Sequence, residues 1–154
     1  MKLSITFRSA IAAMVASALL VLAGCATMES AWKSTKNFVA ASYVKLTGGE
    51  EVPPVTTAAS GSGRITVKED MSVSGSVKTT GIVGTAAHIH AGAAGKNGAV
   101  VIALTKSSDG NTWSVPDGAK LTAAQYKEYK AGNLYINVHS AAHKNGELRG
   151  QLKP

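Results

Sequence analysis

The segment Thr85-Ala-Ala-His-Ile-His-Ala-Gly92 contains alternating polar and apolar side chains, and Tyr135-Ile-Asn-Val-His139 repeats that alternation. Successive side chains of a β-strand point to opposite faces of the sheet, so His88 and His90 share one face. In the second segment His139 occupies the polar face. If both apolar faces enter one core, the three histidines stand on the side away from that core, where they can converge on a ligand.

Short alternating runs continue from Tyr43 to the C-terminus and are separated by Gly, Asn, Asp and Pro. This pattern is typical of an antiparallel all-β domain. The runs 63–68 and 73–77 predict one hairpin, and the runs 134–139 and 147–152 predict another. About 110 residues are enough for one compact domain with a single core.

Three further segments carry structural expectations. Thr122 and Gln125 fit a capping box, which predicts one short helix near 122–131. The run 99–104 is apolar on both faces and predicts a strand that is covered on each side. Trp113 is the best candidate for a large side chain that anchors the core.

The first 24 residues are expected to form a secretory signal peptide. Lys2 and Arg8 flank the start of an apolar run from 10 to 23, which is short for a membrane span. The run ends in Leu22-Ala-Gly-Cys25, which resembles the bacterial lipobox, where the cysteine becomes the lipid-modified first residue. An ordinary signal peptide with an incidental cysteine is the alternative.

The lipobox interpretation divides the chain into three parts: a lipoprotein signal peptide (1–24), a tether after lipidated Cys25 (25–42) and the β domain (43–154). The membrane is then a partner through the lipid anchor. Ala26 follows the cysteine, and resemblance to Gram-negative lipoproteins then favours the outer membrane. We expect a lipid-anchored protein on the periplasmic side of that membrane or on the cell surface.

The charge distribution and the cysteine count bear on nucleic-acid binding and on disulfide bonds. The formal net charge is +7 at pH 7, and removal of residues 1–24 lowers it to +5 because Lys2 and Arg8 leave without any acid. The remaining Lys and Arg residues are scattered without interleaved aromatic residues, which argues against a nucleic-acid partner. Cys25 is the only cysteine, so a disulfide within the chain is excluded.

Two predicted hairpins share one pattern. Each runs from a strand-end histidine, His90 or His139, through small residues to Lys-Asn-Gly, at 96–98 and at 144–146. Asn-Gly favours positive φ and tight strand reversal. Two hairpins of like build can present His90 and His139 at equivalent positions, which favours their convergence at one end of the domain.

The chain carries a series of motifs in order: Leu46-Thr-Gly-Gly-Glu-Glu-Val-Pro-Pro54, Gly61-Ser-Gly63, Gly84-Thr-Ala-Ala-His-Ile-His-Ala-Gly92, Asn97-Gly-Ala-Val100, Trp113, Leu121-Thr122, Ala131-Gly-Asn-Leu-Tyr-Ile-Asn-Val-His139 and Gly146-Glu-Leu-Arg-Gly-Gln151. Together they resemble the bacterial CHRD (chordin-type) domain over roughly residues 44–152. This resemblance implies an antiparallel Greek-key β-sandwich, immunoglobulin-like or superoxide-dismutase-like, in an extracytoplasmic location.

A more distant resemblance concerns the histidines. The order His-x-His, glycine-rich loop and apolar strand ending in Val-His is similar to the copper-ligand pattern of copper–zinc superoxide dismutases, with His88, His90 and His139 at copper-binding positions. The paired cysteines of that family are missing, and no further His and Asp residues suggest a zinc site. Arg149 could lie near the metal, but nothing in the pattern makes it an anion-guiding residue.

Imidazole is a ligand for copper, zinc and nickel, and Cu(II) binds most tightly among the divalent ions. The sequence therefore predicts a metal site at the three histidines, with copper as Cu(I) or Cu(II) first and zinc second. His143, Glu51 and Glu147 are candidate auxiliary ligands. No catalytic residue is assigned, because no activated serine is evident and Cys25 is expected to carry lipid.

Three readings of function stay open at this level. The first is copper binding for storage or delivery, with copper-handling proteins as partners. The second is a superoxide dismutase-like redox enzyme, which needs an open copper position. The third is a metal-free scaffold or adhesion module, in which the histidines are polar residues on a solvated sheet face.

Overall fold

The computed structural model describes residues 41–154, so the predicted signal peptide and Cys25 lie outside the described residues. Of the predicted tether only residues 41 and 42 are described, and Ser42 already belongs to the first strand. The elements are β1 (Ser42–Thr47), η1 (Gly48–Glu50), β2 (Ser60–Val67), β3 (Val73–Thr80), β4 (Gly84–Ala91), β5 (Val100–Ala103), β6 (Thr105–Lys106), β7 (Thr112–Ser114), α2 (Ala123–Lys130), β8 (Leu134–Ser140) and β9 (Leu148–Leu152).

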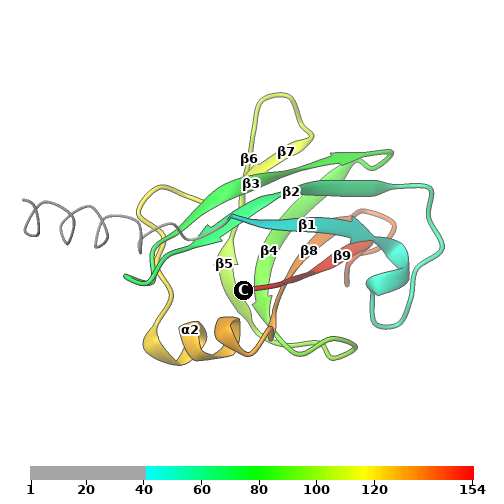
Figure 1. The fold of residues 1–154 in the computed structure, drawn as a ribbon. Helices are drawn as coiled ribbons and strands as arrows, with labels where there is room; N and C mark the ends of the chain where they lie inside the picture. The colour runs from blue at the N-terminus through cyan, green and yellow to red at the C-terminus, as the bar shows by residue number, and fades with distance from the viewer. Residues whose placement is uncertain (1–40) are drawn as a thin grey trace, which may run out of the picture. The chain divides into compact units, whose positions relative to one another are not determined.

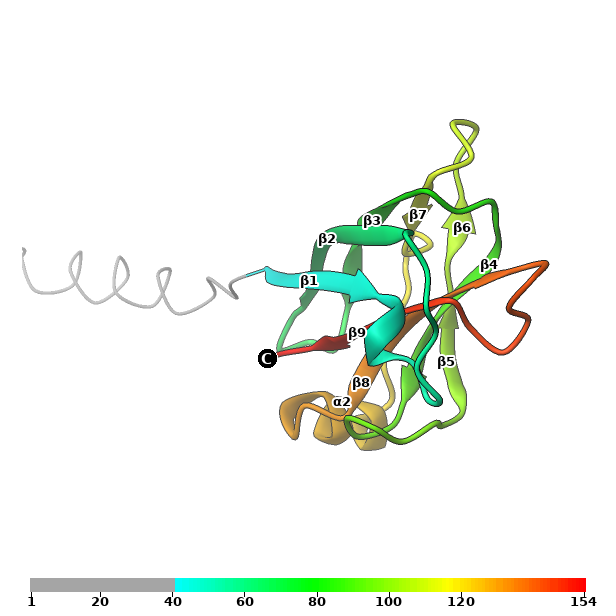
Figure 2. The ribbon, with the colours of Figure 1, turned by 90° about the vertical axis from the view of Figure 1, so that its right-hand side faces the viewer.

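The strands form one antiparallel sheet in the order β5-β4-β8-β9-β1-β2-β3-β7-β6. Its two end strands, β5 and β6, are consecutive in the chain and are separated by Leu104 alone. The Leu104 amide donates to the Ala87 carbonyl at 2.9 Å, so this extended run bonds to β4 at one end and to β7 at the other. The sheet therefore nearly closes on itself into a barrel-like sandwich (Figures 1 and 2). The predicted all-β, antiparallel class is confirmed.

One apolar core fills the interior of the curved sheet. The predicted hairpins are present, as β2–β3, β4–β5 and β8–β9, and the predicted anchor Trp113 is buried. The side chains that are almost fully enclosed come from β1, β2, β3, β4, β7, β8 and β9. The largest apolar ones are Trp113, Leu46, Ile65, Ile89, Leu134, Ile136, Leu148 and Leu152.

The expectation that the run 99–104 is covered on both faces was wrong. Val100 is 54% exposed, and Ala103 is also exposed, whereas Leu104 is buried. The run lies at the closure of the sheet, where one face meets the core and no second layer from residues 41–154 covers the other. Its apolar composition could not distinguish a strand covered on both faces from this arrangement.

The helix forms where the sequence places it. In α2 the Thr122 hydroxyl accepts from the Gln125 amide, and the Gln125 side chain accepts from the Thr122 amide, so both halves of the capping box are present. Gly132 follows with φ of +75°, which suits the end of a helix. Tyr129 packs into the core. Within residues 41–154, no helix is long and apolar enough to span a membrane.

The pairing of β4 with β8 determines where the histidines lie. His90 pairs with Tyr135, His88 with Asn137, and Ala86 with His139. On the outward face of β8, Tyr135 and Asn137 are each only 3% exposed. The polar face that alternation predicted is therefore not an open surface, because loops from both ends of the sheet fold over it.

We expect Thr122→Ala to lower the free energy of unfolding by about 1 kcal/mol, because it removes the acceptor for the Gln125 amide at the start of α2. Urea unfolding at pH 7.5 measures the change. Thr122→Ser keeps the hydroxyl and should stay close to the unaltered protein. Equal stability of the alanine and serine variants would contradict this role for the cap.

Candidate metal centre

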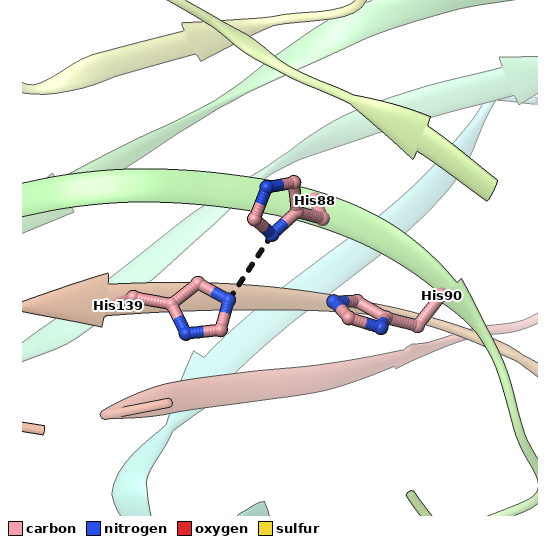
Figure 3. A group of neighbouring side chains, drawn as sticks. All are labelled: His88, His90 and His139. Atoms are coloured by element: carbon pink, nitrogen blue, oxygen red, sulfur yellow. Dashed lines mark hydrogen bonds between the residues drawn. The ribbon is translucent and has the colours of Figure 1, made fainter. Parts of the chain in front are cut away.

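The structure brings His88, His90 and His139 together on the outward face of β4 and β8. One ring nitrogen from each residue lies within 4.8 Å of the others, and no further group of three such ligands occurs in residues 41–154. The ring of His88 is centred 5.5 Å from that of His90 and 5.0 Å from that of His139. Figure 3 shows the three rings directed toward a common point.

Hydrogen bonds determine which nitrogens face that point. His90 Nδ1 lies 3.0 Å from the Gly98 carbonyl, and His139 Nδ1 lies 2.9 Å from the Lys144 carbonyl. A carbonyl only accepts, so both Nδ1 atoms carry protons and both Nε2 atoms keep a free lone pair. The third nitrogen is His88 Nδ1, which lies 3.1 Å from His139 Nε2 (Figure 3).

The cluster fits a metal ion. His90 Nε2 is buried and has no hydrogen-bond partner within residues 41–154, which is costly for a polar atom unless a ligand uses its lone pair. His88 Nδ1 donates to His139 Nε2 when no ion is bound, because the His139 proton is on Nδ1. To bind a metal through Nδ1, His88 must carry its proton on Nε2. The ligand atoms would then be His88 Nδ1, His90 Nε2 and His139 Nε2.

The two Lys-Asn-Gly hairpins support the rings from opposite sides of the site. Gly98 supplies the carbonyl for His90, and Lys144 supplies the one for His139. Both segments hold a histidine ring through a backbone carbonyl, but the carbonyl belongs to the glycine of Lys-Asn-Gly in one and to the lysine in the other. Only glycine fits at 98, since a Cβ there would lie 1.6 Å from the Ala91 carbonyl oxygen.

The surroundings of all three imidazoles favour the neutral form. Burial lowers the pKa of His88, and the neighbouring His139 and His90 lower it further. Burial also lowers the pKa values of His90 and His139, against the opposing effect of their hydrogen bonds to backbone carbonyls. Neutral imidazole is the form that binds a metal, so the apo site is already in the protonation state that an ion requires.

His90, Tyr135 and Arg149 form a stack of three side chains. The Tyr135 ring is parallel to the His90 ring to within 11°, with centres 5.0 Å apart, and Arg149 Cζ lies 3.5 Å from the centre of the Tyr135 ring. Tyr135 is on β8, between β4 and β9, so His90 and Arg149 approach it from opposite sides. The Tyr135 hydroxyl accepts from the Gly98 amide at 3.1 Å.

Sequence reasoning did not assign a role to Tyr135 or Gly98, and it left Arg149 open. Alternation along 147–152 does place Arg149 on the outward face, beside the strand that carries His139. That signal could have indicated a supporting residue, but not the stack. The stack forms because β8 lies between β4 and β9, and this strand order cannot be derived from the alternation of the sequence.

The three auxiliary candidates lie outside the group of ring nitrogens. Asn137 Nδ2 donates to Glu51, and Thr57 donates to Glu147 at 2.8 Å. Burial raises the pKa of Glu51, whereas hydrogen bonds from Ser140 and Thr57 lower that of Glu147 despite burial. His143 lies close enough to both carboxyl groups to lower their pKa values. Their assignment as ligands stays a prediction.

A surface pocket of about 380 Å³ lies next to the loop that supports His139. Glu51, His143 and Lys144 are among the residues that line it, together with the 52–55 segment. The Lys144 carbonyl bonds to His139, so one wall of the pocket belongs to the support of the histidine site.

An antiparallel all-β domain with three converging imidazoles is thus the class of protein that the fold and the site define. The chain belongs to the CHRD domain family, whose model matches residues 43–152. Comparison with curated proteins and with solved structures found no match.

The stability of the metal-free protein should fall as the pH drops below about 6.5. The folded-state pKa values of the three histidines are lowered, so the unfolded chain binds more protons in this range and stability rises with pH. Urea unfolding at pH 7.5 and 5.5 measures the difference. His90→Gln removes one of these groups and should show a smaller loss. A loss as large as that of the unaltered protein would contradict the assignment.

Proposed function

We propose that residues 43–154 bind copper through His88, His90 and His139 and serve copper storage or delivery. The observation that carries the proposal is the buried Nε2 of His90, which has no hydrogen-bond partner within residues 41–154, in a residue whose ring nitrogen lies within 4.8 Å of those of His88 and His139. Three neutral imidazoles suit copper and zinc, and affinity for a nitrogen site peaks at Cu(II) among the divalent ions. Copper is therefore the first candidate and zinc the second.

The support of the rings favours this reading over a metal-free scaffold. On a scaffold, histidines on a solvated sheet face need no fixed orientation. Here His90 and His139 are each held through Nδ1 by a backbone carbonyl, and the opposite nitrogen of His90 is left buried without a partner. An unpaired buried polar atom costs about 1–3 kcal/mol, and a bound ion would remove that cost.

Storage or delivery is favoured over superoxide turnover by the position of Arg149. Its side chain is 1% exposed, and its hydrogen-bond donors face backbone and amide oxygens beneath the loop. It is thus not placed to attract an anion from solvent. Rapid consumption of superoxide by the copper-loaded protein would favour the enzymatic alternative instead.

The proposed location is the periplasmic side of the outer membrane or the cell surface, with Cys25 as the lipid-modified residue. A lipid anchor would hold the domain at a membrane surface without spanning it. There it could exchange copper with other copper-handling proteins, which are the partners that this function requires.

Titration of the metal-free protein with Cu(II), and with Cu(I) under anaerobic conditions, should give one ion per chain. His88→Ala and His139→Ala each remove one ligand atom and should weaken binding by at least about a hundredfold, more than the loss of an outer contact usually costs. Isothermal titration calorimetry and competition with chelators measure this.

Lys144→Ala is the matched control, because the Lys144 backbone, and not its side chain, contacts His139. It should keep the affinity of the unaltered protein. His143→Ala tests the auxiliary role of that residue in the same assay. Unchanged stoichiometry and affinity in both His88→Ala and His139→Ala would sink the proposed site.

Cys25→Ser should leave the protein without lipid, because serine cannot accept the thioether-linked lipid. Mass spectrometry should detect acyl chains and an N-terminus at Cys25 in the unaltered protein, and neither in the serine variant. An unaltered protein without acyl chains would argue against the lipid anchor.

A further inference from the structure

Arg149 places a buried positive charge beneath the histidine site. The side chain is 1% exposed, and a guanidinium stays protonated in proteins. Its hydrogen-bond acceptors are neutral: they are the Ala93 carbonyl at 3.0 Å, the Lys96 carbonyl at 2.9 Å, Asn97 Oδ1 at 3.3 Å and Gln151 Oε1 at 3.4 Å.

The charge is only partly compensated by an acid. Arg149 acts on Glu51, but the Glu51 carboxyl is committed to Asn137, and burial raises its pKa. The three imidazoles carry no negative charge either. A metal ion bound to them therefore experiences a fixed positive charge without a carboxylate or thiolate among the three ligands.

The stack limits the distance between the guanidinium and the His90 ring. Arg149 Cζ lies 3.5 Å from the centre of the Tyr135 ring, which lies 5.0 Å from the centre of the His90 ring. The guanidinium is thus at most roughly 8.5 Å from the His90 ring, in a partly buried region where the effective dielectric constant is well below that of water. Coulomb repulsion between the guanidinium and an ion held by His90 grows with the charge of that ion.

We propose that Arg149 makes the three-histidine site bind Cu(I) more tightly than Cu(II). The inference rests on the proposed copper-binding function. Cu(II) carries one more unit of positive charge than Cu(I), so the guanidinium raises its free energy more. The imidazole ligands are neutral, so they do not offset the larger repulsion that Cu(II) experiences. The ion that the domain holds for storage or delivery is then the monovalent one.

Arg149 also orders the loop, so the test must separate charge from support. Gln151 offers a matched control, because its side chain donates to Gly92 at the start of the same loop, at 2.9 Å, and to Gly132 at 2.8 Å. Gln151→Met loosens the same support and removes the most distant acceptor of Arg149, at 3.4 Å, without changing any charge. Arg149→Lys keeps the charge and loses the forked donor.

The experiment measures Cu(I) affinity by competition with bicinchoninate and Cu(II) affinity by competition with nitrilotriacetate, with circular dichroism to verify folding. Removing the charge in Arg149→Met should lower the ratio of Cu(I) to Cu(II) affinity by on the order of tenfold. Arg149→Gln should lower the ratio by a similar factor. It retains an amide donor, so it serves as the neutral variant if Arg149→Met does not fold. Arg149→Lys and Gln151→Met should keep the ratio close to that of the unaltered protein.

Each outcome decides the matter. A folded neutral variant with an unchanged ratio overturns the inference, as does an equal fall in Gln151→Met. In the unaltered protein the reduction potential of bound copper should lie above that of aqueous copper, and a lower potential overturns the inference without any variant. Failure of the unaltered protein to bind either ion would instead overturn the proposed function, and this inference with it.

Discussion

Hydrogen bonds from the buried guanidinium of Arg149 tie the loop of residues 92–98 to β9, and the geometry of the site follows from them. The same loop ends in Gly98, whose carbonyl orients the His90 ring and whose amide binds the Tyr135 hydroxyl. One side chain on β9 thus supports a ring on β4, two strands away. The cost of burying its charge is offset by several acceptors and an aromatic face.

Alternation predicted much of the fold, because a curved sheet around one core buries every second side chain. It placed the hairpins and the face that carries the histidines, and the size of its side chain identified Trp113 as the anchor of the core. It failed for the run 99–104, where apolar composition on both faces suggested two covering layers. The chain there lies at the closure of the sheet, and Val100 remains exposed. Closure depends on strand order, which alternation does not contain.

The candidate site was predictable to the level of a shared face. Two histidines at i and i+2, and a third on a similar hairpin, were enough to expect His88, His90 and His139 together. The ring nitrogens that face one another could not be predicted, because backbone carbonyls in the loop after each strand select them, and the path of those loops is not contained in the alternation. The burial of Tyr135 and Asn137 also escaped the pattern, since loops far apart in sequence cover them.

The sheet ends in two very short strands, β5 with four residues and β6 with two. Recognition by strand addition requires a row of unpaired backbone groups on an exposed edge. In residues 41–154 these end strands offer only a few unpaired backbone groups. The amide of Leu104, between the two strands, is already bonded to the Ala87 carbonyl. Strand addition at these end strands would therefore form few backbone hydrogen bonds. The short end strands also disfavour edge-to-edge strand pairing between copies of the domain at high local concentration.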